Sequence, residues 1–439
     1  MRSDYSTQAL NKFDKIPGDS RKKVFERLLK SNLDFKNLQN NYDKRHSWHA
    51  FPAKFPADLP RIFIENLTQI DDIILDPMAG SCTTLIEAAL LQRQAIGLDI
   101  DPLSLIVGKA KFQRFKLEVA YHTGNSVLRK AKDEFDYNKN ILKNKRNERF
   151  DKETLEFLDY WFLKETQLEL LALLQEIERV EDDAIKRFLM SVFSGVIITK
   201  SGGVTLARDL AHTRPHKVES KIHKSAFPEF YKKLFNNLQD FENLPDSRVL
   251  LKEADAQKMP LKDERIDLIV TSPPYANNAI DYMRAHKFSL VWFGYKISDL
   301  KGIRKIYLGS ETVLNFPLDS LPDYSNDIVV RLKKANQKKG KALHRYYSEM
   351  SGVIKEMYRV LKHGRACVII VASSVLSGLD VEAHLCLAEI GRHHGFDVVH
   401  IGERSIDRNK RMMPTSHTKT NSQIETRMHN EYVIGFWKP

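Results

Sequence analysis

The sequence predicts an α/β fold in which a mostly parallel sheet is covered by helices on both faces. Short apolar runs that suit buried strands alternate with longer segments of helix formers that lack glycine and proline. The first of these runs ends in a glycine turn and the second ends in acidic residues. Strands that alternate with helices favour parallel pairing, because parallel strands need a crossover connection that is usually a helix.

The expected elements follow one another in a regular order. In "DDIILDPMAG" an apolar strand gives way to a glycine turn, and "CTTLIEAALLQRQ" continues as a helix. "AIGLDIDP" and "PLSLIVGKAKFQRF" repeat the strand and the helix. Later strands are expected at Val249–Leu251, Ile266–Val270, Ala366–Ala372, Val398–Ile401 and Tyr432–Trp437, with helices at Tyr346–Leu361 and Val381–His394.

Two insertions interrupt this pattern. About 130 residues separate the second helix from the third strand, whereas about 2–6 residues are usual for such a connection. Apolar residues at helical spacing make this insertion largely helical: Ile185, Phe188, Leu189, Val192, Phe193 and Val196. The second insertion contains "RLKKANQKKGK", which is polar enough to be mobile unless a partner orders it. We predict an N-terminal extension at 1–45, a first half of the sheet domain at 46–114, an inserted module at 115–245, and a second half at 246–439 with an insertion at about 301–342.

Composition narrows the class of protein. Lys and Arg number 69 against 57 Asp and Glu, and the net charge of +12 favours a polyanionic partner. The three cysteines, Cys82, Cys367 and Cys386, are scattered, so we expect no metal site and a reducing compartment. The first residues lack the apolar core of a signal peptide, and no apolar stretch approaches the ~18 residues of a membrane span. A soluble cytoplasmic protein is expected.

The stretch "DPMAGSCTT" lies where the first strand passes into a helix. This geometry exposes backbone N–H groups, and small residues let the chain approach a ligand closely. The carboxylates of Asp76 and Asp99 suit ligand hydroxyls or a cationic amine better than a phosphate. Neither G-x-G-x-x-G nor a lysine-bearing P-loop is present. A nucleoside-like cofactor without a pyrophosphate is favoured, and an ordinary tight turn is the alternative at this point.

A family resemblance decides between the cofactor site and the ordinary turn. "DPMAGSCTT" resembles the D-P-F-x-G-S-G-T-T motif of S-adenosylmethionine-dependent DNA methyltransferases that modify exocyclic amines, and "TSPPY" resembles their catalytic motif. "FPAKFP" and "EADAQKMPLKDERIDLIVTSPPY" resemble two further family segments in the family order. The resemblance covers roughly residues 46–112 and 250–439. It implies a Rossmann-like class I methyltransferase sheet and S-adenosylmethionine as cofactor.

The resemblance implies specific site residues. Ser272, Pro273, Pro274 and Tyr275 are the expected catalytic residues. The Ser272 hydroxyl and the Pro273 carbonyl would accept the two hydrogens of a base amine, and Tyr275 would stack on a base that has left the duplex. The expected cofactor-binding residues are Phe51, Pro52, Lys54, Phe55, Asp76, Pro77, Ala79, Gly80, Ser81, Thr83, Thr84, Asp99, Ile100, Asp255, Ala256 and Thr271.

Cys82 stands where the family motif has its second glycine. A left-handed backbone would strain a cysteine at this position, whereas a residue that merely begins the helix would tolerate the side chain. Because Thr83 and Thr84 continue the family pattern unshifted, we expect the second arrangement.

Double-stranded DNA is the expected partner, and nucleoid association in a prokaryotic-type cytoplasm is the expected location. Basic residues in the central insertion and near the C-terminus are candidate DNA contacts: Arg208, Arg214, Lys217, Arg408, Lys410 and Arg411. Family members with Ser-Pro-Pro-Tyr mostly act on the N4 amine of cytosine, so Ser272 favours cytosine over the N6 amine of adenine. The same residues leave open an RNA amino-methyltransferase and a catalytically silent DNA-binding subunit. A setting in restriction–modification is implied, while a cognate endonuclease and the oligomeric state, monomer or dimer, are left open.

Overall fold

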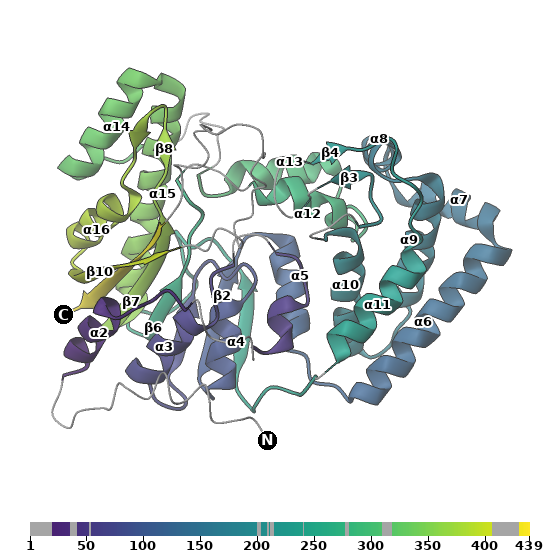
Figure 1. Ribbon diagram of the computed structural model, residues 1–439, viewed down its shortest axis with the longest axis horizontal. Helices are drawn as coiled ribbons and strands as arrows, with labels where there is room; N and C mark the ends of the chain where they lie inside the picture. Colours follow the sequence, from purple (N-terminus) through teal and green to yellow (C-terminus); the bar gives the residue numbers. More distant parts are fainter. Residues whose placement is uncertain are drawn as a thin grey trace.

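Seven strands form one mixed sheet in the computed structural model (Figure 1). The structure describes residues 20–35, 42–51, 54–199, 203–208, 210, 215–239, 241–276, 281–309, 318–405 and 430–439. In spatial order the strands are β5 (Val249–Glu253), β2 (Gln94–Asp99), β1 (Ile73–Asp76), β6 (Ile266–Thr271), β7 (Leu361–Ala372), β11 (Asn430–Lys438) and β10 (Asp397–Ser405). The first five are parallel, whereas β11 is antiparallel to both of its neighbours. The predicted Rossmann-like sheet is confirmed, and each predicted strand overlaps one of these seven.

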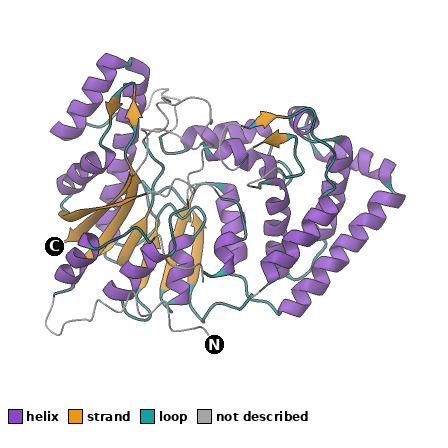
Figure 2. Cartoon of the chain, in the orientation of Figure 1, coloured by secondary structure: helices purple, strands orange, loops and turns teal. Residues whose placement is uncertain are grey.

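Helices cover both faces of this sheet (Figure 2). One face carries α2 (Arg21–Lys30), α3 (Asp58–Leu67), α4 (Thr83–Leu90) and part of α5 (Pro102–Lys111). The other face carries α15 (Gln337–Val360) and α16 (Ala383–His393), against which α14 (Asp323–Ala335) packs. The helices predicted from residues 82, 102, 346 and 381 onwards correspond to α4, α5, α15 and α16.

Side chains of β7 alternate between the two layers. Cys367, Ile369 and Val371 belong to the core beneath α15, whereas Ala366, Val368 and Ile370 belong to the core beneath α2 and α3. Each of the six side chains is at most 1% exposed. A strand that is buried on both faces reads as one continuous apolar run, which is why it could be located from sequence.

The first insertion is a helical module beside the sheet (Figure 1). Its elements are α6 (Leu117–Tyr137), α7 (Lys139–Arg149), α8 (Lys152–Trp161), α9 (Lys164–Glu178), α10 (Asp183–Ile197), α11 (Ala226–Leu238) and a short ribbon of β3 (Ala207–Arg208) and β4 (His216–Lys217). The helical stripe predicted at 185–196 lies in α10 and is buried. This module shares a core with α5 and with α12 (Tyr282–Leu290), so it is held against the sheet domain by apolar contacts.

The remaining elements are short or lie near the edge of the sheet. They are η1 (Lys44–Ser47), α13 (Ile297–Ile306) and a ribbon of β8 (Val375–Leu376) and β9 (Leu379–Asp380). Within the described part of the chain, no helix combines the length and the apolarity that crossing a membrane requires.

The prediction of a mobile polar segment at "RLKKANQKKGK" is wrong. Residues 331–341 form the end of α14 and the start of α15, which pack against each other. Leu332 and Gly340 are buried between the two helices, and a Cβ on Gly340 would lie 2.6 Å from the Lys333 backbone nitrogen. The burial of these two residues orders a segment that its polar composition alone would predict to be exposed to solvent.

Candidate active site

A cavity of about 750 Å³ lies at the carboxyl edge of the parallel strands. Residues that end or follow four neighbouring strands line it: Ala79 and Gly80 after β1, Asp99 and Ile100 at β2, Asp255 and Ala256 after β5, and Ser272 and Pro274 after β6. Open α/β sheets bind ligands at this edge, because adjacent loops there diverge and leave a crevice. The motifs that lie far apart in the sequence therefore share one cavity.

Most of the predicted site residues line this cavity. Besides the residues just named, they include Phe51, Lys54, Phe55, Pro77, Ser81 and Thr83. Five others do not line it but directly adjoin lining residues in the sequence: Asp76, Thr84, Thr271, Pro273 and Tyr275. Pro52 lies outside the described residues.

The glycine turn approaches the ligand space closely. Gly80 has a φ of +47°, and its N–H donates to Asp99 Oδ2 over 2.7 Å. A Cβ on Gly80 would lie 3.4 Å from Cε1 of Phe51, a cavity-lining ring. A glycine at this position therefore permits the positive φ and leaves the space between the turn and the Phe51 ring free for a ligand.

Cys82 adopts the strained conformation, so our expectation for it is wrong. Its φ of +64° and ψ of +31° are left-handed, and it is the N-cap residue of α4 without a side-chain capping bond. The side chain is fully buried, and its Sγ would lie 2.7 Å from a Cβ on Gly108 of α5. A left-handed non-glycine residue costs about 1–2 kcal/mol. Here the burial of the sulfur between α4 and α5 offsets part of that cost.

Asp99 is an acidic group of the cavity whose side chain is oriented by hydrogen bonds to both carboxylate oxygens. Its Oδ2 accepts from Gly80 N–H and from the Ser104 hydroxyl over 2.8 Å, and its Oδ1 accepts from the N–H of Asp101 over 2.8 Å. Burial, followed by the charge of Asp101, raises its pKa to about 6. Asp99 is thus ionised at neutral pH, fixed in direction, and only partly hydrated.

Asp76 connects the first motif to the second from behind the cavity. Its Oδ1 accepts from the Thr271 hydroxyl over 2.7 Å, and the Thr84 hydroxyl donates to the carbonyl of Val270 over 3.1 Å. All of these groups are buried, and burial raises the pKa of Asp76 to about 6. The end of β1 is therefore tied to the end of β6 at the point where both motifs begin.

The Ser-Pro-Pro-Tyr segment leaves the sheet directly after Thr271. Ser272 and Pro274 face the cavity, and Pro273 is buried. Proline lacks an N–H, so no ladder hydrogen bond is lost where the strand ends. The two rings fix the backbone direction between the hydroxyl of Ser272 and the ring of Tyr275.

Tyr275 is anchored by the last strands of the sheet. Its hydroxyl donates to Glu431 Oε1 over 2.8 Å, and Glu431 pairs through Oε2 with the guanidinium of Arg404. Arg404 also donates to the carbonyl of Leu33 over 3.2 Å. Burial, followed by the Glu431 charge, holds the pKa of Tyr275 well above its usual value, so the phenol remains a donor.

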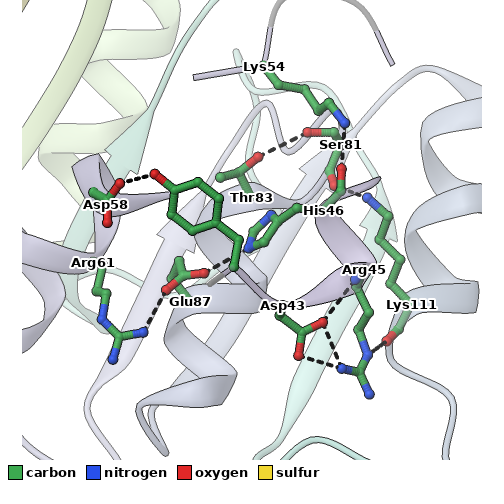
Figure 3. A network of polar contacts seen from close by, with 11 residues as sticks. Asp43, Arg45, His46, Lys54, Asp58, Arg61, Ser81, Thr83, Glu87 and Lys111 are labelled. Carbon is green, nitrogen blue, oxygen red and sulfur yellow. Dashed lines mark hydrogen bonds and ion pairs between the residues drawn. The ribbon is translucent and has the colours of Figure 1, made fainter. Parts of the chain in front are cut away.

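A polar network holds the segment before the glycine turn in place (Figure 3). Glu87 of α4 is buried and contacts His46 over 2.8 Å and Arg61 over 3.2 Å. Lys111 of α5 is also buried, and its ammonium donates to the Ser81 carbonyl over 2.7 Å. Since these groups belong to η1, α3, α4 and α5, the network fixes the turn relative to the segment that carries Phe51.

The sequence interpretation missed a cluster contributed by α12 and α13. The Phe51 ring lies 5.9 Å from the Tyr282 ring and 4.9 Å from the His286 ring, centroid to centroid. His286 Nδ1 lies 2.6 Å from Asp101 Oδ2, which also accepts from Tyr307 over 2.8 Å. The i, i+4 spacing of Tyr282 and His286 was the available signal, because it places both rings on one face of a helix.

Comparisons with known proteins agree with this geometry. A sequence profile of the N6/N4 family described as "DNA methylase" matches residues 3–105. The type II methyltransferase M.MvaI of Kocuria varians is 25% identical over 431 residues, which cover 89% of this chain and 89% of that protein. M.AvaI of Nostoc sp., also a type II methyltransferase, is 23% identical over 441 residues, covering 91% and 89%. M.BsoBI of Geobacillus stearothermophilus, of the same type, is 24% identical over 326 residues, covering 67% and 62%.

These matches support an S-adenosylmethionine-dependent DNA amino-methyltransferase. The resemblance that the motifs indicated is thereby confirmed. The cofactor of this methyltransferase is S-adenosylmethionine, and the residues of the cavity fit it. Gly80 leaves a backbone cradle, Asp99 presents a carboxylate that suits hydroxyls, and the Phe51 and Tyr282 rings suit a sulfonium cation.

The two candidate DNA contacts that the structure describes, Arg208 and Lys217, do not line the cavity. Arg208 and Lys217 lie on the ribbon of the helical module, where β3 pairs with β4. Lys217 lies 4.5 Å above the Tyr160 ring and 3.8 Å from Glu219. Arg214, Arg408, Lys410 and Arg411 fall outside the described residues.

The first prediction concerns the pH dependence of cofactor binding. We propose that ionised Asp99 accepts hydrogen bonds from the ribose hydroxyls, so affinity is lost as the pH falls through about 6, where Asp99 takes up a proton. The loss should approach tenfold per pH unit below that value. Calorimetric titration of the DNA-free protein between pH 8 and pH 5 measures it. Asp99→Asn should bind weakly with a flatter profile, and exposed Asp71→Asn should match the parent. A constant dissociation constant over this range would contradict the role of Asp99.

The second prediction concerns the anchored tyrosine. Tyr275→Ala should lose a stacking contribution of about 1–3 kcal/mol per base together with most of the methyl transfer. Tyr275→Phe should be intermediate, because it keeps the ring but loses a hydrogen bond to a charged group worth about 1.5–3 kcal/mol. Single-turnover methylation of unmethylated DNA compares the variants, and both should bind the cofactor normally. Equal activity of the Phe and Ala variants would contradict a role for the ring.

Proposed function

We propose that this chain transfers the methyl group of S-adenosylmethionine to the N4 amine of a cytosine that is flipped out of double-stranded DNA. The observation that carries the proposal is the position of Ser272 and Pro274 in the same cavity as the glycine turn and Asp99. A base amine held at Ser272 and Pro274 would meet a cofactor held by the glycine turn and Asp99.

The chemistry follows from the nature of the amine. Its lone pair is delocalised into the ring, so the nitrogen is a weak nucleophile. The Ser272 hydroxyl oxygen and the Pro273 carbonyl oxygen accept its two hydrogens and favour a tetrahedral nitrogen with the lone pair directed outward. The bound cofactor supplies an electrophilic methyl group. Proline suits this role because the next proline keeps it extended, which presets the direction of its carbonyl.

Tyr275 would receive the flipped base. Extrusion of a base costs a few kcal/mol, and stacking on an aromatic ring offsets part of that cost. The hydrogen bond of Tyr275 to Glu431 fixes the ring before the base arrives, so less conformational entropy is lost on stacking.

The choice of base depends on Ser272. A serine before the two prolines supports cytosine N4 as the target, and the net charge of +12 supports a nucleic acid substrate. We also assign sequence reading to the helical module, which lies beside the sheet domain and shares a core with α12. Nucleoid association of the protein follows from DNA as its substrate.

The third prediction identifies the product. Unmethylated genomic DNA is incubated with the protein and isotope-labelled cofactor, then digested to nucleosides and analysed by mass spectrometry. Label should appear in N4-methylcytosine, because Ser272 presents a hydroxyl acceptor rather than a carboxylate. Label in N6-methyladenine would overturn the cytosine assignment and leave the amino-methyltransferase assignment in place. Label only in RNA supplied in parallel would overturn the DNA assignment.

The fourth prediction tests the serine itself. Ser272→Ala should lower the rate of methyl transfer by about a hundredfold, the typical effect of removing one preorganised polar group at a reacting centre. Cofactor affinity measured by calorimetry should be unchanged. Ser351→Ala is a matched control, because Ser351 bonds His394, which directly follows α16, and does not line the cavity. Full activity of Ser272→Ala would remove the catalytic role of the hydroxyl.

A further inference from the structure

A second cavity of about 680 Å³ adjoins the active site. It lies between η1, the end of α10 and one side of α11, where the helical module meets the sheet domain. Lys54 lines both cavities, so the two share a wall. Apart from Lys54 of "FPAKFP", no residue of the sequence motifs lines this second cavity.

The second cavity carries an excess of positive charge. Four of its lining residues are lysines from separate parts of the chain: Lys44, Lys54, Lys232 and Lys233. Its two carboxylates are already compensated by cations that do not line it. Asp43 pairs with Arg45 over 2.7 Å, and Glu229 pairs with Lys224 over 3.0 Å. The lining therefore carries four lysines against two carboxylates, each of which also pairs with a further cation.

A buried imidazole in the same cavity lacks a hydrogen-bond partner on one side. His49 is 1% exposed, and its Nε2 lies 2.9 Å from the Ser194 hydroxyl. Within the described residues, its Nδ1 contacts no donor or acceptor. Burial, followed by the charge of Lys233, holds the pKa of His49 well below its usual value. When Nε2 accepts from Ser194, the neutral ring carries its hydrogen on Nδ1, and an anion that reached this buried nitrogen would supply the missing acceptor.

We propose that this second cavity binds a phosphodiester of the DNA strand that carries the target base. The proposal rests on the proposed function, because DNA is the polyanion that reaches this edge of the sheet. Lysines hold phosphates through charge rather than base recognition, so the site positions the strand and does not read its sequence. Its wall at Lys54 places the held strand next to the cavity that would receive the base.

The experiment measures the salt dependence of DNA binding. Lys44 and Lys232 are exposed, so their replacement by glutamine leaves the buried core intact. Each lost phosphate contact should reduce the slope of log affinity against log salt by about 0.9. Because the cavity holds a single phosphodiester, the double variant Lys44→Gln, Lys232→Gln should lose about 0.9 in slope in anisotropy titrations of a DNA duplex between about 50 and 200 mM salt.

A double control variant carries the same charge change on other surfaces. Lys23→Gln, Lys262→Gln removes two exposed lysines, one on α2 and one in the loop at the amino end of β6, opposite the cavities. Its slope should match that of the parent. Equal slopes for both double variants and the parent would overturn the phosphate site while leaving the methyltransferase assignment intact. Failure of the parent to bind DNA, or tighter binding of an RNA duplex, would instead count against the proposed function.

Discussion

The hydrogen bond between Asp76 and Thr271 is the constraint on which the active site depends. It joins two buried side chains over 2.7 Å, at the ends of β1 and β6. These strands are neighbours in the sheet, with Leu75 opposite Ile269, although about 190 residues separate them in the sequence. Because the bond is sequestered from water, it contributes roughly 1 kcal/mol or more and leaves little freedom between the two motifs that follow. The cavity exists because the glycine turn and the Ser-Pro-Pro-Tyr segment begin at the same place.

The position of Tyr275, four residues after Thr271, depends on segments from the early and the late part of the chain. Tyr275 leaves β6 but is held by Glu431 of β11, which pairs with Arg404 of β10. Arg404 in turn donates to Leu33, next to α2, so an early segment supports a late strand that supports the ring. A substitution at Arg404 would therefore act on Tyr275 through a buried ion pair, whose disruption typically costs about 3–5 kcal/mol.

The central strands β1, β6 and β7 were predictable from sequence because each contains an apolar run that the sheet buries on both faces. The cavity was predictable because the motifs end those strands. The conformation of Cys82 was not, since a left-handed angle depends on how α4 packs on α5 around the sulfur. The prediction that residues 331–341 are mobile was wrong for a related reason. It rested on the average polarity of the segment, whereas two of its residues, Leu332 and Gly340, are buried and order it by contacts with the neighbouring helix. The ring cluster at Tyr282 and His286 depends on Phe51, about 230 residues earlier, and local pattern does not reveal such a pairing.

Charge is distributed over this edge of the sheet in a way that suits two ligands of opposite sign. The acids Asp99 and Asp101 lie at the floor of the first cavity, and Asp101 is buried. The cations Lys301, Arg304 and Lys305 are exposed on α13 at its rim, and the second cavity carries four lysines. Charges interact more strongly at a buried site than at an exposed one, because water screens them less. Under the proposed function, a sulfonium cofactor would be attracted to the acids of the floor, while a phosphate backbone would be attracted to the basic residues of the rim and of the second cavity. Whether a charged side chain is buried or exposed matters more here than how many charges there are, because the buried acids and the exposed basic residues suit different ligands.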